Sequence, residues 1–471
     1  MNILVINGSP SGENSITLQT VNYIGKFFPQ HSFEVIDAGR KIRSIEKDFE
    51  PSAEALRKAE LIIFCYPVYT FLVPAQLHRF IELIKESGIN LSGKPATQIT
   101  TSKHFYDVTA HRFIQDNCDD LGLNYVRGLS ADMDDLLKKK GRKEALDFFK
   151  FLMWSVENGC YEPKMYEAGA FRKAPKDGCN ECGAKTETAE PEVSFKADPA
   201  AKAKRGTVAL VADGLEADPC LKAMTDAFIR TCSMNVKVID IADFPFAGGC
   251  LGCFNCAADG KCVYKDGFDG LLREGIQTAD ATVYAFRIKD HSMGYRFKLF
   301  DDRQFCNGHR TVTMGKPVGY LIDGSLEREP NVRMLLESRA QVGGNFLAGL
   351  ACSSGPACAQ SCERQIETLA KTLEFAVRED YQQPQNFYGV GGLKIFRDLI
   401  YQMQGLMRED HRFYKEHGFY DFPQKKKGRI AAMYLVGGMM NNKKLKKKIG
   451  GKMTEGMMMP YKKLLESIDK K

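Results

Sequence analysis

Four cysteines lie close together in the second half of the chain. Cys250, Cys253, Cys256 and Cys262 are spaced as C-x2-C-x2-C-x5-C. Short turns can bring four such thiolates to the corners of one four-iron cluster. Zinc also binds four thiolates, but its sites usually consist of two separated C-x2-C pairs. The spacing therefore favours an iron–sulfur cluster, with structural zinc and free thiols as the alternatives.

A loop rich in hydroxyl groups follows the first apolar segment. It contains Ser9, Ser11, Asn14, Ser15 and Thr17, and a helical pattern begins at its end. A helix N-terminus offers free backbone N–H groups and a favourable dipole to an anion. The loop has neither the G-x-G-x-x-G spacing of a dinucleotide site nor the G-K-[ST] of a Walker loop. It suits a phosphate monoester held by neutral donors; an ordinary helix-capping turn is the alternative.

Two further loops follow the third and fourth expected strands. The candidate binding residues in them are Pro67, Val68, Tyr69 and Thr70 in one loop and Thr100, Thr101 and Ser102 in the other. In a doubly wound sheet of order 2-1-3-4-5, the carboxyl ends of strands 1, 3 and 4 border the crevice where ligands bind. An aromatic loop shaped by proline can flank a flat ring there, while the first loop holds the phosphate.

The three loops resemble those of the flavodoxin-like NAD(P)H-dependent FMN reductases, including the iron–sulfur flavoprotein branch. The resemblance covers residues 1–150 in its motifs and residues 206–380 as a fold. It implies that Ser9–Thr17 binds the FMN phosphate, that Pro67–Thr70 packs against the isoalloxazine, and that Thr100–Ser102 contacts the edge of the ring. For the four cysteines it implies a [4Fe–4S] cluster near FMN across a dimer interface.

Two positions depart from the pattern of that family. His78 stands where the family usually has Lys, and Lys103–Tyr106 replaces the more usual Gly-Gly. The second half of the chain departs further, because Gly214-Leu215-Glu216 stands where the first half has Gly8-Ser9-Pro10. Hydroxyl groups are replaced there by an acid and an aliphatic side chain, which would repel a phosphate. We therefore predict one FMN per chain, bound by the first half.

Apolar segments alternate with amphipathic segments of helical length in both halves, as in a parallel α/β sheet. The strands of the first half are expected at Ile3–Ile6, Phe33–Ile36, Leu61–Tyr66, Ala96–Thr100 and Asn124–Val126. Those of the second half are expected at Thr207–Val211, Val236–Ile239, Thr282–Phe286, Val318–Ile322 and Asn345–Leu347. Gly-Lys-Pro precedes the fourth strand in both. We therefore expect a duplicated five-stranded, doubly wound, flavodoxin-like domain.

The expected organisation has four parts. An FMN-binding domain at residues 1–158 is followed by a linker at 159–205, a degenerate domain with the cysteines at 206–380, and a basic helical region at 381–471. In the last region we expect helices at Leu393–Arg412, Ile430–Lys448 and Gly456–Lys470.

The resemblance implies an FMN-dependent oxidoreductase that takes electrons from NAD(P)H. A quinone, a nitro or azo compound, or a protein would accept the electrons, directly or through the cluster. This chemistry needs no protein nucleophile or acid–base pair, so we assign no catalytic side chain. Two alternatives stay open: a non-enzymatic electron-transfer module, and a second half that serves as an interaction domain with structural zinc.

Charge is distributed unevenly along the chain. Residues 425–471 carry 14 Lys or Arg and 3 Asp or Glu, whereas the rest carries 52 and 56. The mildly acidic body argues against nucleic-acid binding. The basic residues of the tail flank the uncharged run Ile430–Met440, which is too short to cross a bilayer. We expect this run to pack on the second domain and not on a membrane surface.

The N-terminus predicts a cytoplasmic protein, because it begins as a strand and lacks the basic segment of a signal peptide. In that reducing compartment, clustered cysteines suggest metal or redox roles and not disulfides. The expected partners are a nicotinamide cofactor and an electron acceptor, with a homodimer as an open arrangement.

Overall fold

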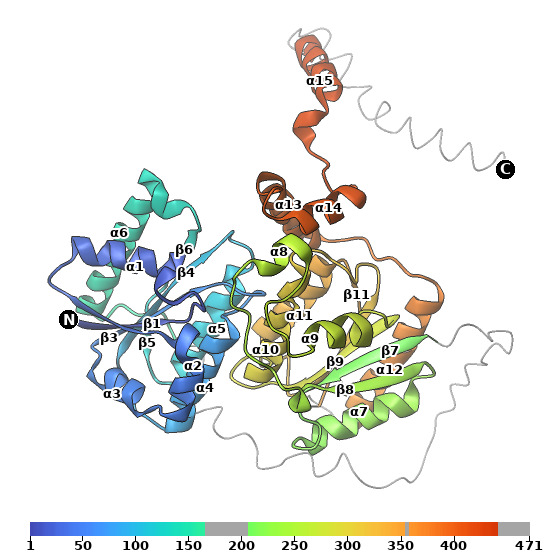
Figure 1. The fold of residues 1–471 in the computed structure, drawn as a ribbon, viewed down its shortest axis with the longest axis horizontal. Coiled ribbons are helices and arrows are strands. Elements are labelled where there is room, and N and C mark those ends of the chain that lie inside the picture. The colour runs from blue at the N-terminus through green and yellow to red at the C-terminus, as the bar shows by residue number, and fades with distance from the viewer. Residues whose placement is uncertain (165–205, 354–357, 441–471) are drawn as a thin grey trace. The chain divides into compact units, whose positions relative to one another are not determined.

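Two parallel β-sheets organise the chain, and helices cover both faces of each sheet (Figure 1). The computed structural model describes residues 1–164, 206–353 and 358–440. Both sheets belong to the larger of two units, Met1–Phe413, and Tyr414–Lys471 forms the smaller unit. The expected α/β architecture with two doubly wound parallel sheets and a helical C-terminal region is confirmed.

The first sheet has the strand order β2-β1-β3-β4-β5. This is the order 2-1-3-4-5 on which the expected ligand-binding crevice depends. Its strands are β1 (Asn2–Asn7), β2 (Ser32–Ile36), β3 (Leu61–Pro67), β4 (Pro95–Ser102) and β5 (Asn124–Tyr125), with β6 (Leu129–Asp132) also paired to β4. β5 pairs with the start of β4 and β6 with its end. The expected fifth strand is therefore interrupted, near Gly128, where an added side chain would collide with Gln98.

Helices cover the first sheet on both faces. They are α1 (Ile16–Phe27), α2 (Ala38–Lys47), α3 (Glu50–Lys58), α4 (Ala75–Ser87), α5 (Asp107–Asp120) and α6 (Lys139–Asn158), with short turns η1 (Gly12–Asn14) and η2 (Asp135–Leu137). Side chains alternate between the two faces of a strand. Accordingly Ile3 and Val5 pack with α1 and α6, whereas Leu4 and Ile6 pack with the helices of the other face.

The second sheet repeats the topology with the order β11-β10-β9-β7-β8. Its strands are β7 (Thr207–Ala212), β8 (Asn235–Asp240), β9 (Ala281–Arg287), β10 (Pro317–Asp323) and β11 (Phe346–Cys352). α7 (Pro219–Thr231) and α12 (Cys358–Arg378) cover one face, and α10 (Tyr295–Arg303) and α11 (Pro330–Gly343) cover the other. Short segments complete it: η3 (Ile241–Asp243), α8 (Asn255–Asp259), α9 (Phe268–Gly270), η4 (Leu271–Ile276) and η5 (Gln304–Asn307).

The repeated Gly-Lys-Pro motif makes the same contact in both halves. The Lys94 ammonium donates to the carbonyl of Ala59 at 2.6 Å, and the Lys316 ammonium donates to that of Ala279 at 2.7 Å. Each lysine thereby ties the start of the fourth strand to a residue two positions before the third strand. Equivalent bonds at equivalent positions support a duplication of one domain.

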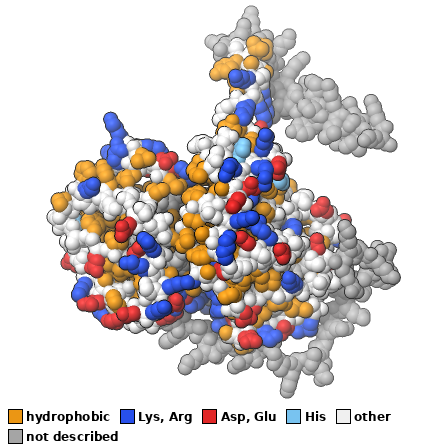
Figure 2. Space-filling model, viewed as in Figure 1, with side chains coloured by type: hydrophobic (Ala, Val, Ile, Leu, Met, Phe, Trp, Pro, Cys, Tyr) orange, Lys and Arg blue, Asp and Glu red, His pale blue; other side chains and the backbone are white. Residues whose placement is uncertain are grey.

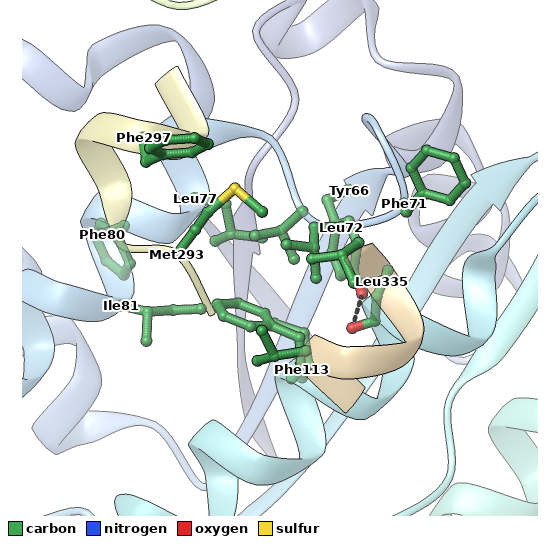
Figure 3. Close-up of a cluster of buried hydrophobic side chains, with 14 of the residues drawn as sticks. Tyr66, Phe71, Leu72, Leu77, Phe80, Ile81, Phe113, Met293, Phe297 and Leu335 are labelled. Atoms are coloured by element: carbon green, nitrogen blue, oxygen red, sulfur yellow. Dashed lines mark hydrogen bonds between the residues drawn. The ribbon is translucent and has the colours of Figure 1, made fainter. Parts of the chain in front are cut away.

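One continuous hydrophobic core joins the two halves of the larger unit. α4 contacts α10 and α5 contacts α11, so each of these helices meets its own counterpart in the repeat. Figure 3 shows Met293 and Phe297 of the second half beside Leu77, Phe80 and Phe113 of the first. The contact has the self-complementary pattern of a two-fold dimer interface, but it lies within one chain.

The C-terminal region is helical, with boundaries that differ from those expected. The single helix expected at Leu393–Arg412 is two helices, α13 (Phe387–Gln402) and α14 (Arg408–Glu416). α13 begins early because the Asn386 side chain accepts two backbone N–H groups of its first turn. Gly405 lies between the two helices and is a poor helix former.

The uncharged run Ile430–Met440 lies in α15 (Lys427–Met440), which follows η6 (Pro423–Lys425). The expected packing of this run on the second domain stays a prediction, because the run belongs to the smaller unit, in which Tyr434 and Leu435 are 79% and 72% exposed. Hydrophobic side chains of this helix lie on the surface in Figure 2. No helix within the described ranges is long and apolar enough to cross a membrane. The helix expected at Gly456–Lys470 and most of the expected linker lie outside those ranges.

Candidate functional site

The three predicted loops meet at the carboxyl edge of the first sheet. Gly8 N donates to the carbonyl of Cys65 at 2.8 Å, which joins the loop after β1 to the end of β3. Val68 N donates to the carbonyl of Thr101 at 3.1 Å, and the hydroxyl oxygens of Thr17 and Thr101 are 2.6 Å apart. The structure therefore brings together residues from all three segments that the sequence singled out.

The first loop ends at the N-terminus of α1, where Ser15 is the N-cap residue. Its Oγ accepts the amide of Leu18 at 3.3 Å, and its carbonyl accepts the amide of Gln19 at 3.2 Å. The amides of Ile16 and Thr17 belong to the first turn, whose N–H groups have no acceptor within the helix. These amides and the neighbouring hydroxyls are neutral donors that fit a phosphate group.

The first loop is packed closely against α2. A side chain at Gly39 would collide with the backbone of Ser9, and Gly12 has a φ of +57° that favours glycine. Ser9 is buried, Ser11 is half-buried and Asn14 is exposed. Ser9 therefore belongs to the floor of the loop, whereas Asn14 lies at its rim.

The aromatic segment forms a tight turn after β3, which we call the aromatic turn (Pro67–Leu72). Tyr69 and Leu72 exchange backbone hydrogen bonds of 2.8 and 2.9 Å, and Thr70 has a φ of +41°. Burial raises the pKa of the Tyr69 phenol, so the phenol is neutral at physiological pH. Its ring meets that of Phe305 edge-on, with the centroids 5.4 Å apart. The aromatic turn of the first half thus contacts the second half.

Only part of the segment after β4 faces the other loops. Adjacent strand residues point to opposite faces, so Thr101 reaches the loop after β1, whereas Thr100 Oγ1 lies 2.8 Å from His111 Nε2. Burial lowers the pKa of His111 to about 4, which keeps its imidazole neutral. Ser102 Oγ accepts the backbone amide of His104 at 2.8 Å. Of the three residues in this segment that are predicted to contact the flavin ring, Thr100 therefore points away from the other two loops.

A buried arginine and a glutamine hold the loop that carries the four cysteines, residues 247–266, here called the cysteine loop. Arg303 of α10 donates to the carbonyl of Gly248 at 3.0 Å and to both carboxylate oxygens of Asp266 at 2.7 and 2.8 Å. Gln76 of α4 donates to the carbonyl of Cys250 at 3.3 Å. Both domains therefore fix the position of this loop.

The cysteine loop lies against the aromatic turn. Gly252 has a φ of +60°, and a side chain added there would collide with the hydroxyl oxygen of Tyr69. Cys256 Sγ donates to the carbonyl of Phe305 at 3.2 Å, and the Phe305 ring contacts the Tyr69 ring. The predicted cluster ligands and the predicted flavin-contact turn are thus neighbours across the interface between the two halves.

The donor set of the cysteine loop suits a metal cluster by its chemistry, because it supplies four thiols. Burial raises the pKa of the Cys250 thiol and raises that of Cys256 to about 11, so metal binding there would release protons. Across the described ranges, no group of three or more His, Cys, Asp or Glu side chains is gathered closely enough to hold a metal ion. The cysteines therefore do not form a preassembled site.

The loop after β7 in the second half holds a carboxylate of the chain itself. Asp240 accepts the amides of Gly214 and Leu215 at 2.8 and 2.7 Å. These amides follow β7 as the amides of the hydroxyl-rich loop follow β1. A phosphate there would have to displace Asp240 and would meet its negative charge.

Charged side chains also bridge the crevice of the second half. Asp218 is the N-cap residue of α7, as Ser15 is of α1. Arg287 ends β9 as Pro67 ends β3, and its guanidinium binds Asp218 at 3.0 Å and Asp323 at 2.6 Å. These ion pairs link the ends of the strands where the first half has neutral side chains.

A buried ion pair on α10 is not among the site residues expected from the sequence. Lys298 and Asp302 are completely buried and contact the aromatic turn from the second half. The repeat contains a signal for them: when β9 is aligned with β3, Lys298 corresponds to His78 and Asp302 to Glu82. All four are polar residues on helices that are otherwise largely buried.

Residues 1–113 match the NADPH-dependent FMN reductase family. An iron–sulfur flavoprotein from Archaeoglobus fulgidus is 26% identical over 175 residues, which are 36% of this chain and 79% of that protein. An NADPH-quinone reductase from P. pentosaceus shows 15% identity and a TM-score of 0.27, over 33% of this chain and 97% of that one. An NAD(P)H:quinone oxidoreductase from Methanothermobacter marburgensis shows 14% identity and a TM-score of 0.27, over 35% and 99%.

Proposed function

We propose that the first domain binds FMN and oxidises NAD(P)H, because residues 1–113 match the NADPH-dependent FMN reductase family, a family of oxidoreductases. The observation that carries the proposal is the meeting of the hydroxyl-rich loop, the aromatic turn and Thr101 at one edge of the first sheet. That edge is where a doubly wound sheet binds its ligand.

We assign the binding roles by loop. The proposed phosphate contacts are Ser9, Ser11, Asn14, Ser15 and Thr17, together with the first amides of α1. The proposed ring contacts are Pro67, Val68, Tyr69, Thr70, Thr101 and Ser102, with Thr100 acting as support through its bond to His111. When bound, FMN accepts hydride and passes electrons on. The residues of the chain bind and orient it, and none is assigned a proton transfer.

We also propose that each chain binds a single FMN. The support is the carboxylate of Asp218 at the helix N-cap and the occupation of the loop amides by Asp240, whereas the matching Asp37 of the first domain binds the Asn7 side chain. The domain limits proposed for this division are residues 1–158 for the flavin domain and 206–380 for the second domain. The second domain then acts as a partner that lies against the flavin site.

We propose that the four cysteines bind a [4Fe–4S] cluster. The support is the contact of the cysteine loop with Tyr69, which places the thiols beside the proposed flavin site. Iron and acid-labile sulfide in anaerobically purified protein, at about four of each per chain, is the expected result. Stoichiometric zinc, or protein without metal, would contradict the assignment.

The electron acceptor is proposed as a class: a quinone, a nitro or azo compound, or a redox protein. Steady oxidation of NADH or NADPH by FMN-loaded protein, with one of the small acceptors present, tests the enzymatic function. A protein that binds FMN but oxidises neither nucleotide would be an electron-transfer module. The contact between the cysteine loop and the aromatic turn is the observation that supports this second function.

A further inference from the structure

A buried ion pair of the second domain reaches across the interface to the aromatic turn of the first. Lys298 and Asp302 lie one helical turn apart on α10, and neither side chain is exposed to solvent. A buried charge is costly unless it is paired and hydrogen-bonded. The hydrogen-bond partners of these two side chains therefore indicate the role of the pair.

The Lys298 ammonium uses all three of its donors. It donates to the carbonyl of Tyr69 at 3.0 Å, to the hydroxyl of Thr70 at 2.8 Å and to the carboxylate of Asp302. The Asp302 carboxylate also accepts the hydroxyl of Thr70 at 2.7 Å and the backbone amide of Ala75 at 2.8 Å. Every bond that leaves the pair ends on the aromatic turn or on the start of α4.

The turn that receives these bonds has an unfavourable backbone. Thr70 and Phe71 have φ values of +41° and +69°, a region that non-glycine residues rarely adopt. Such a conformation persists only when its surroundings hold it. Within the first domain, the turn is held by the bonds between Tyr69 and Leu72 and by the hydrogen bond that Thr109 Oγ1 donates to the carbonyl of Phe71. Lys298 and Asp302 add further bonds to the turn from the second domain.

We propose that Lys298 and Asp302 are positioning residues that hold the aromatic turn in the shape that receives the isoalloxazine ring of FMN. The proposal rests on the proposed function, because it assigns the ring to that turn. The second domain, which has lost its own flavin loop, then completes the flavin site of the first. Neither residue needs to touch the flavin, since both act through Tyr69 and Thr70.

The duplication provides a matched control. On the other side of the pseudo-two-fold axis, Glu82 of α4 accepts the amide of Tyr295 at 2.9 Å, as Asp302 accepts that of Ala75. Glu82 also binds Lys289, the counterpart of Tyr69, at 3.0 Å. It therefore makes an equivalent contact across the same interface, but the turn that it holds carries no proposed flavin contact.

The test compares Lys298→Met/Asp302→Asn with Glu82→Gln in the full chain. Neutralising both members of the buried pair leaves no unpaired buried charge. Each protein is stripped of flavin and titrated with FMN while flavin fluorescence is followed, and the visible spectrum and midpoint potential of bound FMN are recorded. We expect the double variant to bind FMN about tenfold more weakly and to shift the spectrum and the potential. Glu82→Gln is expected to match the wild type in all three.

Three outcomes decide the matter. Wild-type affinity, spectrum and potential in the double variant, beside normal FMN binding by the wild type, would overturn the positioning role alone. Equal losses in both variants would show that the pair only stabilises the interface, which also overturns it. A wild type that binds no FMN would instead refute the proposed function. If the double variant does not fold, as judged by its thermal unfolding, Lys298→Gln/Asp302→Asn is titrated with the same expectations, because it also leaves no unpaired buried charge.

Discussion

Asp218 occupies in the second domain the helix N-cap position that Ser15 occupies in the first. Asp218 Oδ1 accepts the amide of Leu221 at 3.0 Å, and Ser15 Oγ accepts that of Leu18 at 3.3 Å. Both residue types cap helices well, so the helix gains similar stability from either. They differ in charge, and a carboxylate at this position would repel the phosphate of FMN.

The variant Ser15→Asp should therefore lose FMN without losing its fold. We expect the dissociation constant of FMN to rise at least about tenfold, because like unit charges about 4 Å apart near a protein surface repel by about 4 kcal/mol, more than the roughly 1.4 kcal/mol of a tenfold change. Titration of the apoprotein with FMN, followed by flavin fluorescence, gives the constant. Ser15→Asn is the control, because it caps the helix and stays neutral. Flavin content that survives in Ser15→Asp would refute the phosphate assignment.

Gly252→Ala should disturb the contact between the cysteine loop and the aromatic turn. The added methyl group would collide with the Tyr69 hydroxyl oxygen, and a left-handed φ at a non-glycine residue costs about 1–2 kcal/mol. We expect a lower thermal unfolding midpoint and a changed spectrum of bound FMN. Gly270→Ala is the control, because a side chain there meets nothing within 4 Å.

The same collision predicts a partial rescue. Tyr69→Phe removes the oxygen atom that a side chain at Gly252 would strike, so Gly252→Ala/Tyr69→Phe should be more stable than the sum of the single changes predicts. The backbone strain at Gly252 would remain. Strict additivity of the unfolding free energies would show that the two loops are not in contact.

His291 should make the stability of the protein depend on pH. It lies at the interface between the two domains, with Nε2 3.1 Å from Asp120 and Nδ1 3.0 Å from Glu329. Burial lowers the pKa of His291, but the hydrogen bonds with Asp120 and Glu329 outweigh burial and raise it to about 9. Asp116 lies near the same imidazole, and the Lys85 ammonium also binds Asp120, at 2.6 Å.

The sign of the pH effect follows from the pKa difference. The raised pKa in the folded state stabilises the protein fully below about pH 6.5, the pKa of an unfolded histidine, and this stability is lost as pH rises through 9. Between pH 6.5 and 9.5 we expect the free energy of unfolding to fall by roughly 1–3 kcal/mol more in the wild type than in His291→Gln. Parallel urea-unfolding curves for the two proteins at every pH would contradict this.

The proposed cluster in the cysteine loop predicts that a change at one of its cysteines lowers the iron content, whereas a change at a cysteine elsewhere does not. Cys256→Ser should lower iron and labile sulfide after anaerobic purification, because it removes one of the four proposed ligands. Cys160→Ser is the control, since Cys160 is an exposed cysteine outside the loop. Unchanged iron in Cys256→Ser would remove this residue from the proposed site.

Much of the fold could be predicted from local sequence patterns. The alternation of apolar strands and amphipathic helices predicted every strand of both sheets except β6, and the repeated Gly-Lys-Pro indicated the duplication. The fifth strand of the first sheet was harder, because its interruption depends on the packing of Gly128 against Gln98.

Only part of the candidate site could be predicted from the sequence. Loops at the ends of strands 1, 3 and 4 meet whenever the strand order is 2-1-3-4-5, so their convergence followed from topology. The contribution of Lys298 and Asp302 did not follow, because it depends on how two domains pack. Thr100 likewise needed the structure, since strand alternation turns its hydroxyl toward His111.

The stoichiometry of FMN binding tests the central claim most directly. Apoprotein of the full chain is titrated with FMN, and the equivalence point is read from flavin fluorescence against protein concentration. One FMN per chain, with loss of binding in Ser15→Asp, is the result that a single site in the first domain predicts. Two FMN per chain, or no saturable binding at all, would contradict it.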